Sequence, residues 1–576
     1  MRIGKIDINP AVNPAILDTA LWDVEGATRI ATAVSAPEWE AMRGAVAQGQ
    51  AMRPAGGVQP CAGSAAAVGG RTYFLAALAD GQQAFVEIGP EGSEDLLGSP
   101  VATMPLGGER LALYGTDAAT IARYVRAIRP DKAPKAWGFL PRLGIGVRMS
   151  AAMWPGAYEA MDRCGFAANS IQNSVRELEL LANILAARPP EAIYLPGFGT
   201  VESGHTGSTF EGLWVHGVLA ALASEGRFRF GADADHIKVS RGREGLHHAR
   251  RVLDSARYYT FFTLDVSGVL DYGAIRTESA LAGERYLAAR IPSERERAAV
   301  LAFHQERRRL ARPSYALDAA TVGRLVGKYW EALDAAEALV ARIRQLKGQE
   351  AFDLELAIDE RTPEIPTCDC ITTDDEVRFV LLEARRRGLP LTHLAPNFGV
   401  EKPVDYRCPD GLAGLEARVR SQYRIAEEFG VMLDFHSGDD LSSATRQVIA
   451  RATQGRNHFK ISPEPQIMFA ETVRDMEPEL FRRWWDASLA YAQREAAGGS
   501  EFAAACLETV TETGAAPSPR DVVFHNFGFA FAGKRDAGGQ YLYREQLYSL
   551  PQAFYDEFRR RLVGYLCLLA GELFSR

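Results

Sequence analysis

Eight short apolar runs, each followed by a polar loop and a stretch with helical periodicity, succeed one another through the middle of this chain. They cover residues 143–149, 169–175, 228–232, 259–264, 353–358, 391–395, 431–435 and 458–461. Parallel strands need a long crossover between them, and a helix in each crossover packs back onto the sheet with one hand. Eight such units in series predict an α/β fold of the TIM (β/α)8 barrel type, with a doubly wound open sheet as the alternative.

Two insertions interrupt the regular spacing of the barrel domain, which we place at residues 136–576. Residues 188–216 are rich in glycine and proline, and residues 267–347 are largely helical and highly charged. Charge runs such as ERER at 294–297 are usually solvated helix faces. Beyond the eighth unit we expect another strand at 522–529 and a final amphipathic helix from about Pro551.

Residues 1–135 form a separate N-terminal α+β domain in this interpretation. We expect strands at 71–78, 84–88 and 111–114, and a helix over 117–128 that begins at Asp117. The Gly-, Ala- and Pro-rich stretch 45–70 is expected to be loop, and Pro130 and Pro134 mark the linker. The domain covers the barrel or mediates assembly into a homo-oligomer, and both readings stay open.

Composition narrows the class of protein. A net charge of -8 and a pI near 5.8 argue against a general role on nucleic acid or on a membrane surface. The N-terminus lacks the apolar core of a signal peptide, and the seven cysteines are scattered without a paired framework. We therefore expect the protein to be located in a reducing cytoplasm. Cys368 and Cys370 form a lone C-x-C, and the missing second pair argues against zinc there.

Polar residues gather at the predicted strand ends, and in a TIM barrel the active site lies at the carboxyl ends of the strands. The run FGADADHIK at 230–238 carries the densest group. The candidate ligands and proton carriers are Asn173, Arg176, Glu177, Asp233, Asp235, His236, Lys238, Asp359, Glu360, Asp434, His436, Asp439, Asp440, His458 and Lys460.

Three of these residues are histidines: His236, His436 and His458. With the carboxylates beside them they suit a divalent metal site, because neutral imidazole binds zinc, manganese, nickel and iron. Two carboxylates beyond the ligand set suit general acid/base work on opposite faces of a substrate. The cations Arg176, Lys238 and Lys460 suit an anionic substrate group.

Several of these residues have a second, structural reading. His458 begins its strand, so it lies at the amino end of the barrel unless the strand starts earlier, near Gly455. In the structural interpretation, Asp439 caps the following helix, and the D-x-D-H cluster forms an Asx turn. His525 is ambiguous. The other histidines considered lie in insertions or on helices and are read as surface or structural: His205, His216, His247, His248 and His304.

Taken in order, these residues resemble the tagaturonate epimerase family, which interconverts the hexuronates tagaturonate and fructuronate. The resemblance runs from about residue 111 to the C-terminus. Its matching pieces are SVRE at 174–177, GADADH at 231–236, Asp359-Glu360 with Pro366-Thr367, HSG at 436–438 with Asp440, Ala452-Thr453 with Gly455, HFK at 458–460 and MEPELF at 476–481.

The resemblance implies a TIM-barrel isomerase that depends on a divalent metal (zinc, manganese, nickel or iron). It implies His236, His436 and His458 as ligands. Glu177 is implied as one acid/base and Glu360 as the other, with Asp359 as the competitor for that second role. The substrate-binding set is expected to be Asn173, Arg176, Asp235, Lys238, Asp440 and Lys460.

Two departures from the family pattern concern substrate contacts. Its first strand ends in Gly-x-Gly-Asp-Arg, whereas here Gly146 is followed by Val147 and Arg148, and Leu441 stands where the family has a lysine. A related sugar acid or ketose is therefore an alternative substrate. A metal-dependent ketose isomerase or aldolase, or a catalytically silent sugar-acid binding protein, is the alternative function.

Overall fold

The computed structural model describes most of the chain. The described residues are 2–3, 6–7, 21, 23–91, 95–147, 151–173, 178, 183, 186, 188, 192–195, 199–202, 209–276, 280–308, 314–359, 365–400, 405–436, 438–513, 517–538 and 540–574.

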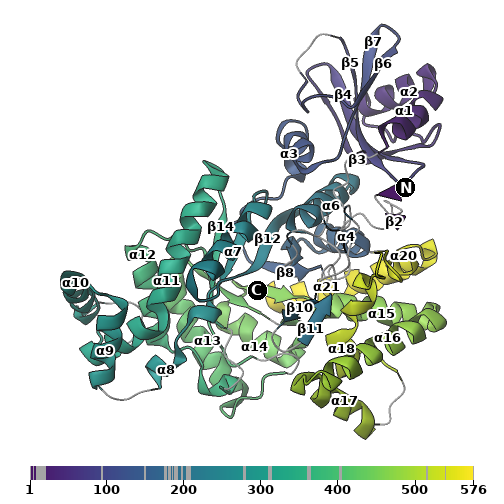
Figure 1. The fold of residues 1–576 in the computed structure, drawn as a ribbon. Helices are drawn as coiled ribbons and strands as arrows, with labels where there is room; N and C mark the ends of the chain where they lie inside the picture. Colours follow the sequence, from purple (N-terminus) through teal and green to yellow (C-terminus); the bar gives the residue numbers. More distant parts are fainter. Residues whose placement is uncertain are drawn as a thin grey trace.

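Eight parallel strands close into a barrel, which confirms the TIM-barrel prediction (Figure 1). In barrel order they are β8 (Arg142–Gly146), β9 (Ala167–Asn173), β12 (Arg229–Lys238), β13 (Phe261–Asp265), β14 (Asp353–Ala357), β15 (His393–Ala395), β16 (Met432–Phe435) and β17 (His458–Ile461). All eight predicted runs are strands of this barrel. The largest difference is at β12, which continues to Lys238 instead of ending at 232.

Helices return the chain from each strand to the next. They include α4 (Trp154–Cys164), α6 (Phe210–Ala223), α7 (Gly242–Ser255), α11 (Ala319–Lys347), α12 (Asp374–Arg386), α13 (Gly411–Glu428) and α14 (Ser443–Thr453). Local chemistry fixes where they begin. Thr373 and Glu376 form a capping box at the start of α12, and the Ser442 hydroxyl caps α14. The C-terminal helix α21 (Gln552–Phe574) packs against α4, α14 and α15 (Pro463–Met476) and so closes the ring.

The N-terminal unit is a five-stranded antiparallel sheet in the order β3 (Val58–Val68), β4 (Arg71–Leu78), β5 (Gln83–Gly89), β7 (Glu109–Tyr114), β6 (Ala102–Leu106). Helices α1 (Val24–Ala33) and α2 (Ala36–Ala47) cover one face and α3 (Ala118–Ala127) covers the other (Figure 1). The last element of this unit ends by Lys132 and β8 begins at Arg142. We propose that the division near residue 135 separates two units of the fold.

The expectation of loop over 45–70 is wrong, because α2 extends to Ala47 and β3 occupies residues 58–68. The sequence of β3, VQPCAGSAAAV, has few large apolar side chains, so it lacks the alternation that marks a strand. Its hydrogen bonds to β4 hold it in the sheet, with a register shift between Cys61 and Ala66.

The two insertions differ in structure. Within the first, β10 (Ala192–Leu195) and β11 (Gly199–Glu202) form an antiparallel hairpin. The second is helical as predicted, with α8 (Tyr272–Ile275), α9 (Ala280–Arg290), α10 (Glu294–Gln305) and α11. The buried His304 of α10 is structural, since it bonds Tyr315 and Glu383.

The expected strand at 522–529 is also wrong. This segment holds the helices α18 (Val522–Phe527) and α19 (Phe529–Gly533). The Asp521 side chain accepts from the backbone N–H of Val523 at 2.8 Å and so starts α18. An apolar run this short does not distinguish a strand from a buried helix by its period, and the cap decides between them.

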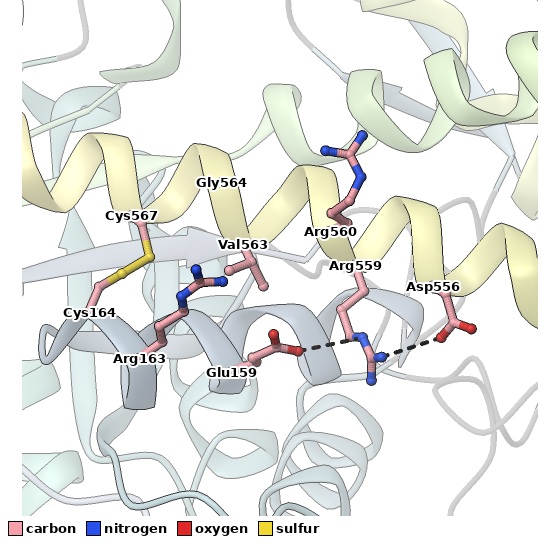
Figure 2. Close-up of a pocket in the computed structure, with 9 residues that line it drawn as sticks. All are labelled: Glu159, Arg163, Cys164, Asp556, Arg559, Arg560, Val563, Gly564 and Cys567. Carbon is pink, nitrogen blue, oxygen red and sulfur yellow. Dashed lines mark hydrogen bonds and ion pairs between the residues drawn. A yellow bond between two sulfur atoms is a disulfide. The ribbon is translucent and has the colours of Figure 1, made fainter.

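Four of the seven cysteines form two disulfides, so the expectation of unpaired cysteines is wrong. Cys368 bonds Cys408, which removes it from any C-x-C metal site. Figure 2 shows the other disulfide, between Cys164 of α4 and Cys567 of α21, in the wall of a surface pocket of about 380 Å³. The partners are 40 and 403 residues apart, so sequence spacing gives little sign of either pair.

None of the helices that the structure describes is long and apolar enough to cross a membrane.

Candidate active site

The cluster of acidic and histidine residues lies within strand β12 of the barrel. Its hydrogen-bond register with β13 shifts between Ala234 and Ile237, and His236 lies in this bulge with a φ of 52°. A non-glycine residue with positive φ is uncommon, and such strain is found preferentially at functional sites. The bulge takes His236 out of strict alternation and places its ring beside that of His436, with the ring centroids 5.0 Å apart.

Asp265, at the end of β13, orients the ring of His236. Its Oδ2 lies 3.3 Å from His236 Nδ1, and Asp265 also accepts hydrogen bonds from the backbone N–H and the hydroxyl of Ser267. Burial opposes the charge of this carboxylate, but His236 and Ser267 together hold the pKa of Asp265 below its usual range. A carboxylate bound to one imidazole nitrogen is the arrangement that directs the other nitrogen toward a metal ion.

His436, one residue beyond β16, lies between two carboxylates. Its Nε2 is 2.7 Å from Glu355 Oε1 and its Nδ1 is 3.0 Å from Asp359 Oδ2. Burial favours the neutral ring, but Asp359 and Glu355 together raise the pKa of His436 to about 10. The structure therefore brings His236, His436 and Asp359 together at the carboxyl end of the barrel.

Lys460 is the cation at the centre of this end of the barrel. Its side chain is 4% exposed, and Nζ lies 2.6 Å from Glu355, 2.9 Å from Asp235 and 3.2 Å from Asp233. Burial and the surrounding carboxylates act in opposite directions, and the pKa of Lys460 lies well above its usual range because the carboxylates prevail. Burial raises the pKa of Asp233 to about 7 although Lys460 opposes the shift.

His458 lies nearer the amino end of the barrel, at the first position of β17. Its Nδ1 is 2.8 Å from Asp434 Oδ2, and its ring packs against Phe261 and His393. Burial, together with the charge of nearby Arg142, holds the pKa of His458 well below its usual range. The sequence reading that places His458 at the amino end therefore matches its position in the fold.

Two groups of side chains in the described part of the chain have the spacing of metal ligands, with donor atoms within 4.8 Å of one another. One is Glu355, Asp434 and His436; the other is His393, Asp434 and His458. Arg142 Nη2 lies 3.0 Å from His393 Nε2, and a guanidinium at that distance disfavours a cation in the second group. Lys460 Nζ lies 2.6 Å from Glu355 of the first group, so a nearby cation does not by itself decide between the two groups. The ring of His236, with its centroid 5.0 Å from that of His436, favours the group that contains His436.

The donor chemistry near His436 fits such an ion. Oδ1 of Asp359 and Oδ1 of Asp434 are buried and have no hydrogen-bond partner among the described residues. Buried oxygens without partners are costly, and coordination to a cation would satisfy them. Imidazole together with carboxylate suits zinc, manganese, nickel or iron.

The remaining predicted residues lie around this centre or outside the described part. Asn173 ends β9 and donates to the carbonyl of Val147. Lys238 ends β12, and Asp440 lies in the short helix Gly438–Asp440. Arg176, Glu177 and Glu360 lie outside the described residues. Asp439 caps a helix, as its structural reading proposed, but that helix is α15: Oδ2 accepts from the backbone N–H of Ser462 and Glu464.

Sequence reasoning missed Asp265, Glu355 and His393. Asp265 directly follows the predicted run 259–264, so reading every strand end would have found it. Glu355 and His393 lie inside short apolar runs, and a polar residue inside a strand gives no sign of which face it occupies.

Comparison with known proteins adds evidence independent of this geometry. The profile of a family described as UxaE, tagaturonate epimerase, matches residues 200–564. A curated tagaturonate/fructuronate epimerase from Thermotoga maritima is 28% identical over 398 residues, which is 64% of this chain and 67% of that protein.

Crystal structures of the fructuronate-tagaturonate epimerase UxaE from Cohnella laeviribosi share the fold. The native form has a TM-score of 0.63 at 20% identity and covers 93% of this chain and 99% of its own. A two-glycerol complex has a TM-score of 0.64 at 19% identity and covers 94% and 100%.

Proposed function

Because the chain belongs to the tagaturonate epimerase family and is a sugar-acid epimerase of hexuronate metabolism, we propose that it interconverts D-tagaturonate and D-fructuronate at the carboxyl end of the barrel. The observation that carries this proposal is the pair of imidazoles, His236 and His436, held 5.0 Å apart among buried carboxylates. The Thermotoga maritima relative carries this substrate pair in its name.

We propose that His236 and His436 hold a divalent metal, with a carboxylate from Asp359 or Glu355 beside His436. When bound, such an ion supplies Lewis acidity that stabilises negative charge on a substrate oxygen, a contribution of several kcal/mol. His458 as the third ligand stays a prediction, and its place at the start of β17 makes it the member most in need of a test.

The inverted carbon of tagaturonate lies one carbon beyond the position α to the ketone, so enolisation alone does not invert it. We propose a retro-aldol route. A base takes the hydroxyl proton at the inverted carbon, and the bond to the α carbon breaks to leave an aldehyde and an enolate. The aldehyde turns its other face, the bond forms again and the proton returns.

Glu177 and Glu360 are proposed as the acid/base pair of this route, with Asp359 as the competitor of Glu360. A positioned acid or base contributes roughly 10²–10⁴-fold to the rate. The 3.0 Å contact between Asp359 Oδ2 and His436 Nδ1 supports Asp359 as that competitor.

We propose the predicted substrate contacts with one change, which concerns Lys460. Asn173, Arg176, Asp235, Lys238 and Asp440 are proposed to bind the hydroxyl and carboxylate groups. The ammonium of Lys460 is surrounded by three carboxylates and is 4% exposed, which favours a role in fixing Asp235 over direct contact with the substrate.

Carbon NMR of the protein with D-tagaturonate tests the function. The expected result is growth of D-fructuronate signals, their loss after chelation and their return with added metal. Cleavage products that accumulate would favour an aldolase, and an aldose product would favour an isomerase. Tight binding with no turnover under any metal would support the silent binding protein instead.

His236→Ala tests the ligand assignment in the same assay. The variant is expected to lose bound metal and activity while its thermal melting stays cooperative. His247→Ala, on the exposed face of α7, is the matched control and should keep both. Full metal content in His236→Ala would remove His236 from the site.

A further inference from the structure

A second pocket lies at the opposite end of the barrel from the proposed active site, between the N-terminal unit and the barrel. Its volume is about 510 Å³. One wall is α3 with the linker 130–136, and the other consists of Trp214 of α6, Tyr258, Thr260 and the end of α11. Thr260 directly precedes β13, whose other end carries Asp265, so this pocket opens at the amino end of the strands.

The charged groups of this pocket are mainly cations. Arg126, Lys135 and Lys347 face a single acid, Glu350. Lys135 makes no ion pair or side-chain hydrogen bond with any residue that the structure describes, although its backbone N–H is fixed to the carbonyl of Phe230 at 3.0 Å. The pocket therefore has an excess of positive charge, and one of its cations, Lys135, has no counter-ion in the part of the chain that the structure describes.

Glu350 bridges the two units, because its carboxylate lies 2.9 Å from Arg126 of α3 and 2.9 Å from Lys347 of α11. Arg126 and Glu350 are 73% and 55% exposed, and exposed ion pairs contribute little to stability. Arg126 can therefore turn toward an anion in the pocket at little cost.

An aromatic wall completes the pocket. The rings of Trp214 and Tyr258 stack with their centroids 4.8 Å apart. Trp214 is 2% exposed, and its Nε1 is buried without an acceptor among the described residues. Aromatic side chains of this kind offer a flat apolar surface on which the ring of a ligand can pack.

We propose that this pocket is a second binding site, distinct from the active site, for a small organic carboxylate with a ring, of the sugar-acid class. The carboxylate would pair with Lys135 and Arg126, and the ring would lie against the edge of the Trp214–Tyr258 stack, since Arg257 lies 4.9 Å over the Tyr258 ring. A volume of about 510 Å³ falls in the range of small-molecule sites, roughly 300–1,000 Å³. A ligand there touches α3, the linker and α11 at once, so its binding ties the N-terminal unit to the barrel.

Titration with D-galacturonate, followed by tryptophan fluorescence and calorimetry on the full chain, tests the proposal. The wild type is expected to show a saturable fluorescence change that Trp214→Phe removes. Lys135→Glu should weaken this binding at least tenfold and leave epimerase turnover unchanged. Arg53→Glu, an exposed charge reversal elsewhere on the N-terminal unit, is the matched control and should bind as the wild type does.

Each other outcome counts against the site. Equal binding by Lys135→Glu and Arg53→Glu would overturn it, as would no binding by the wild type at millimolar ligand. Displacement of D-galacturonate by inorganic phosphate at equal concentration would show a general anion site and refute the sugar-acid class. Because turnover is measured on the same samples, failure of this site is distinguishable from failure of the proposed epimerase function.

Discussion

Asp265→Asn tests whether the Asp265 carboxylate, which contacts His236, sets the affinity of the proposed site for metal. The asparagine keeps the shape of the side chain but is a weaker acceptor, and its amide can donate to the ring, so the tautomer of His236 is no longer fixed. Loss of such a partner typically lowers metal affinity 10–100-fold. The Asp265–His236 distance of 3.3 Å is longer than the ~2.7–2.9 Å of a strong charge-assisted bond. We therefore expect the loss of metal affinity to lie at the lower end of this range, at about tenfold or about 1.4 kcal/mol.

The assay is metal titration of the chelator-stripped protein against a competing chromogenic chelator, with thermal melting of the same samples. Ser267→Ala is the matched comparison, because it removes one support of Asp265 and keeps the carboxylate, and it should weaken binding less than Asp265→Asn. The reasoning is refuted if Asp265→Asn binds metal as tightly as the wild type. It is also refuted if its affinity falls only in step with a loss of folded protein.

Three further changes test the packing around the barrel. Burial opposes the charge of Glu383, but hydrogen bonds from His304 and Arg386 lower its pKa. The charged Glu383 therefore stabilises the fold above about pH 4.3, and this contribution is lost as the pH falls. Glu383→Gln should cost about 2 kcal/mol at pH 7, with the gap in melting temperature narrowing near pH 4. In the denatured wild type three thiols should react with a thiol reagent. Cys567→Ser should lose about 2–4 kcal/mol of stability, and reductant should destabilise it less than the wild type, because only the Cys368–Cys408 bond remains. Lys460→Met leaves three buried carboxylates without their cation and should cost about 3–5 kcal/mol by chemical denaturation; a smaller loss would show that water reaches them.

The barrel could be predicted because its signal is distributed over eight units, so no single error changes the count. Two of the errors, at β12 and β3, occur where a strand lacks large apolar side chains. The prediction ended β12 at 232 because Asp233 and Asp235 read as polar loop, yet both side chains are buried around Lys460. The same cause hid β3, which is built from small residues.

The site was predictable to the extent that its residues follow a strand. His436 and Asp359 do, and His236 lies at a bulge near the end of β12; the structure brings the three together. Glu355 lies within β14, and its importance comes from its contacts with His436 and Lys460, which are 81 and 105 residues away in the chain. Contacts over such distances are set by barrel closure, so no local pattern contains them.

The register of the barrel strands shows at which height along the barrel each candidate ligand lies, and His458 lies at a different height from His436. In the β16–β17 pairing His458 lies opposite Asp434, while His436 and Lys460 each lie two residues further along. Two residues of a strand rise about 6.6 Å, so His458 is one layer below the proposed metal pair. Its Nδ1 binds Asp434, whose pKa is raised by burial and by the charge of Glu355, and Glu355 in turn binds His436. A chain of interacting groups thus leads from His458 through Asp434 and Glu355 to His436. These contacts favour a positioning role for His458, exerted through Asp434 and Glu355, over a place among the ligands of the proposed metal.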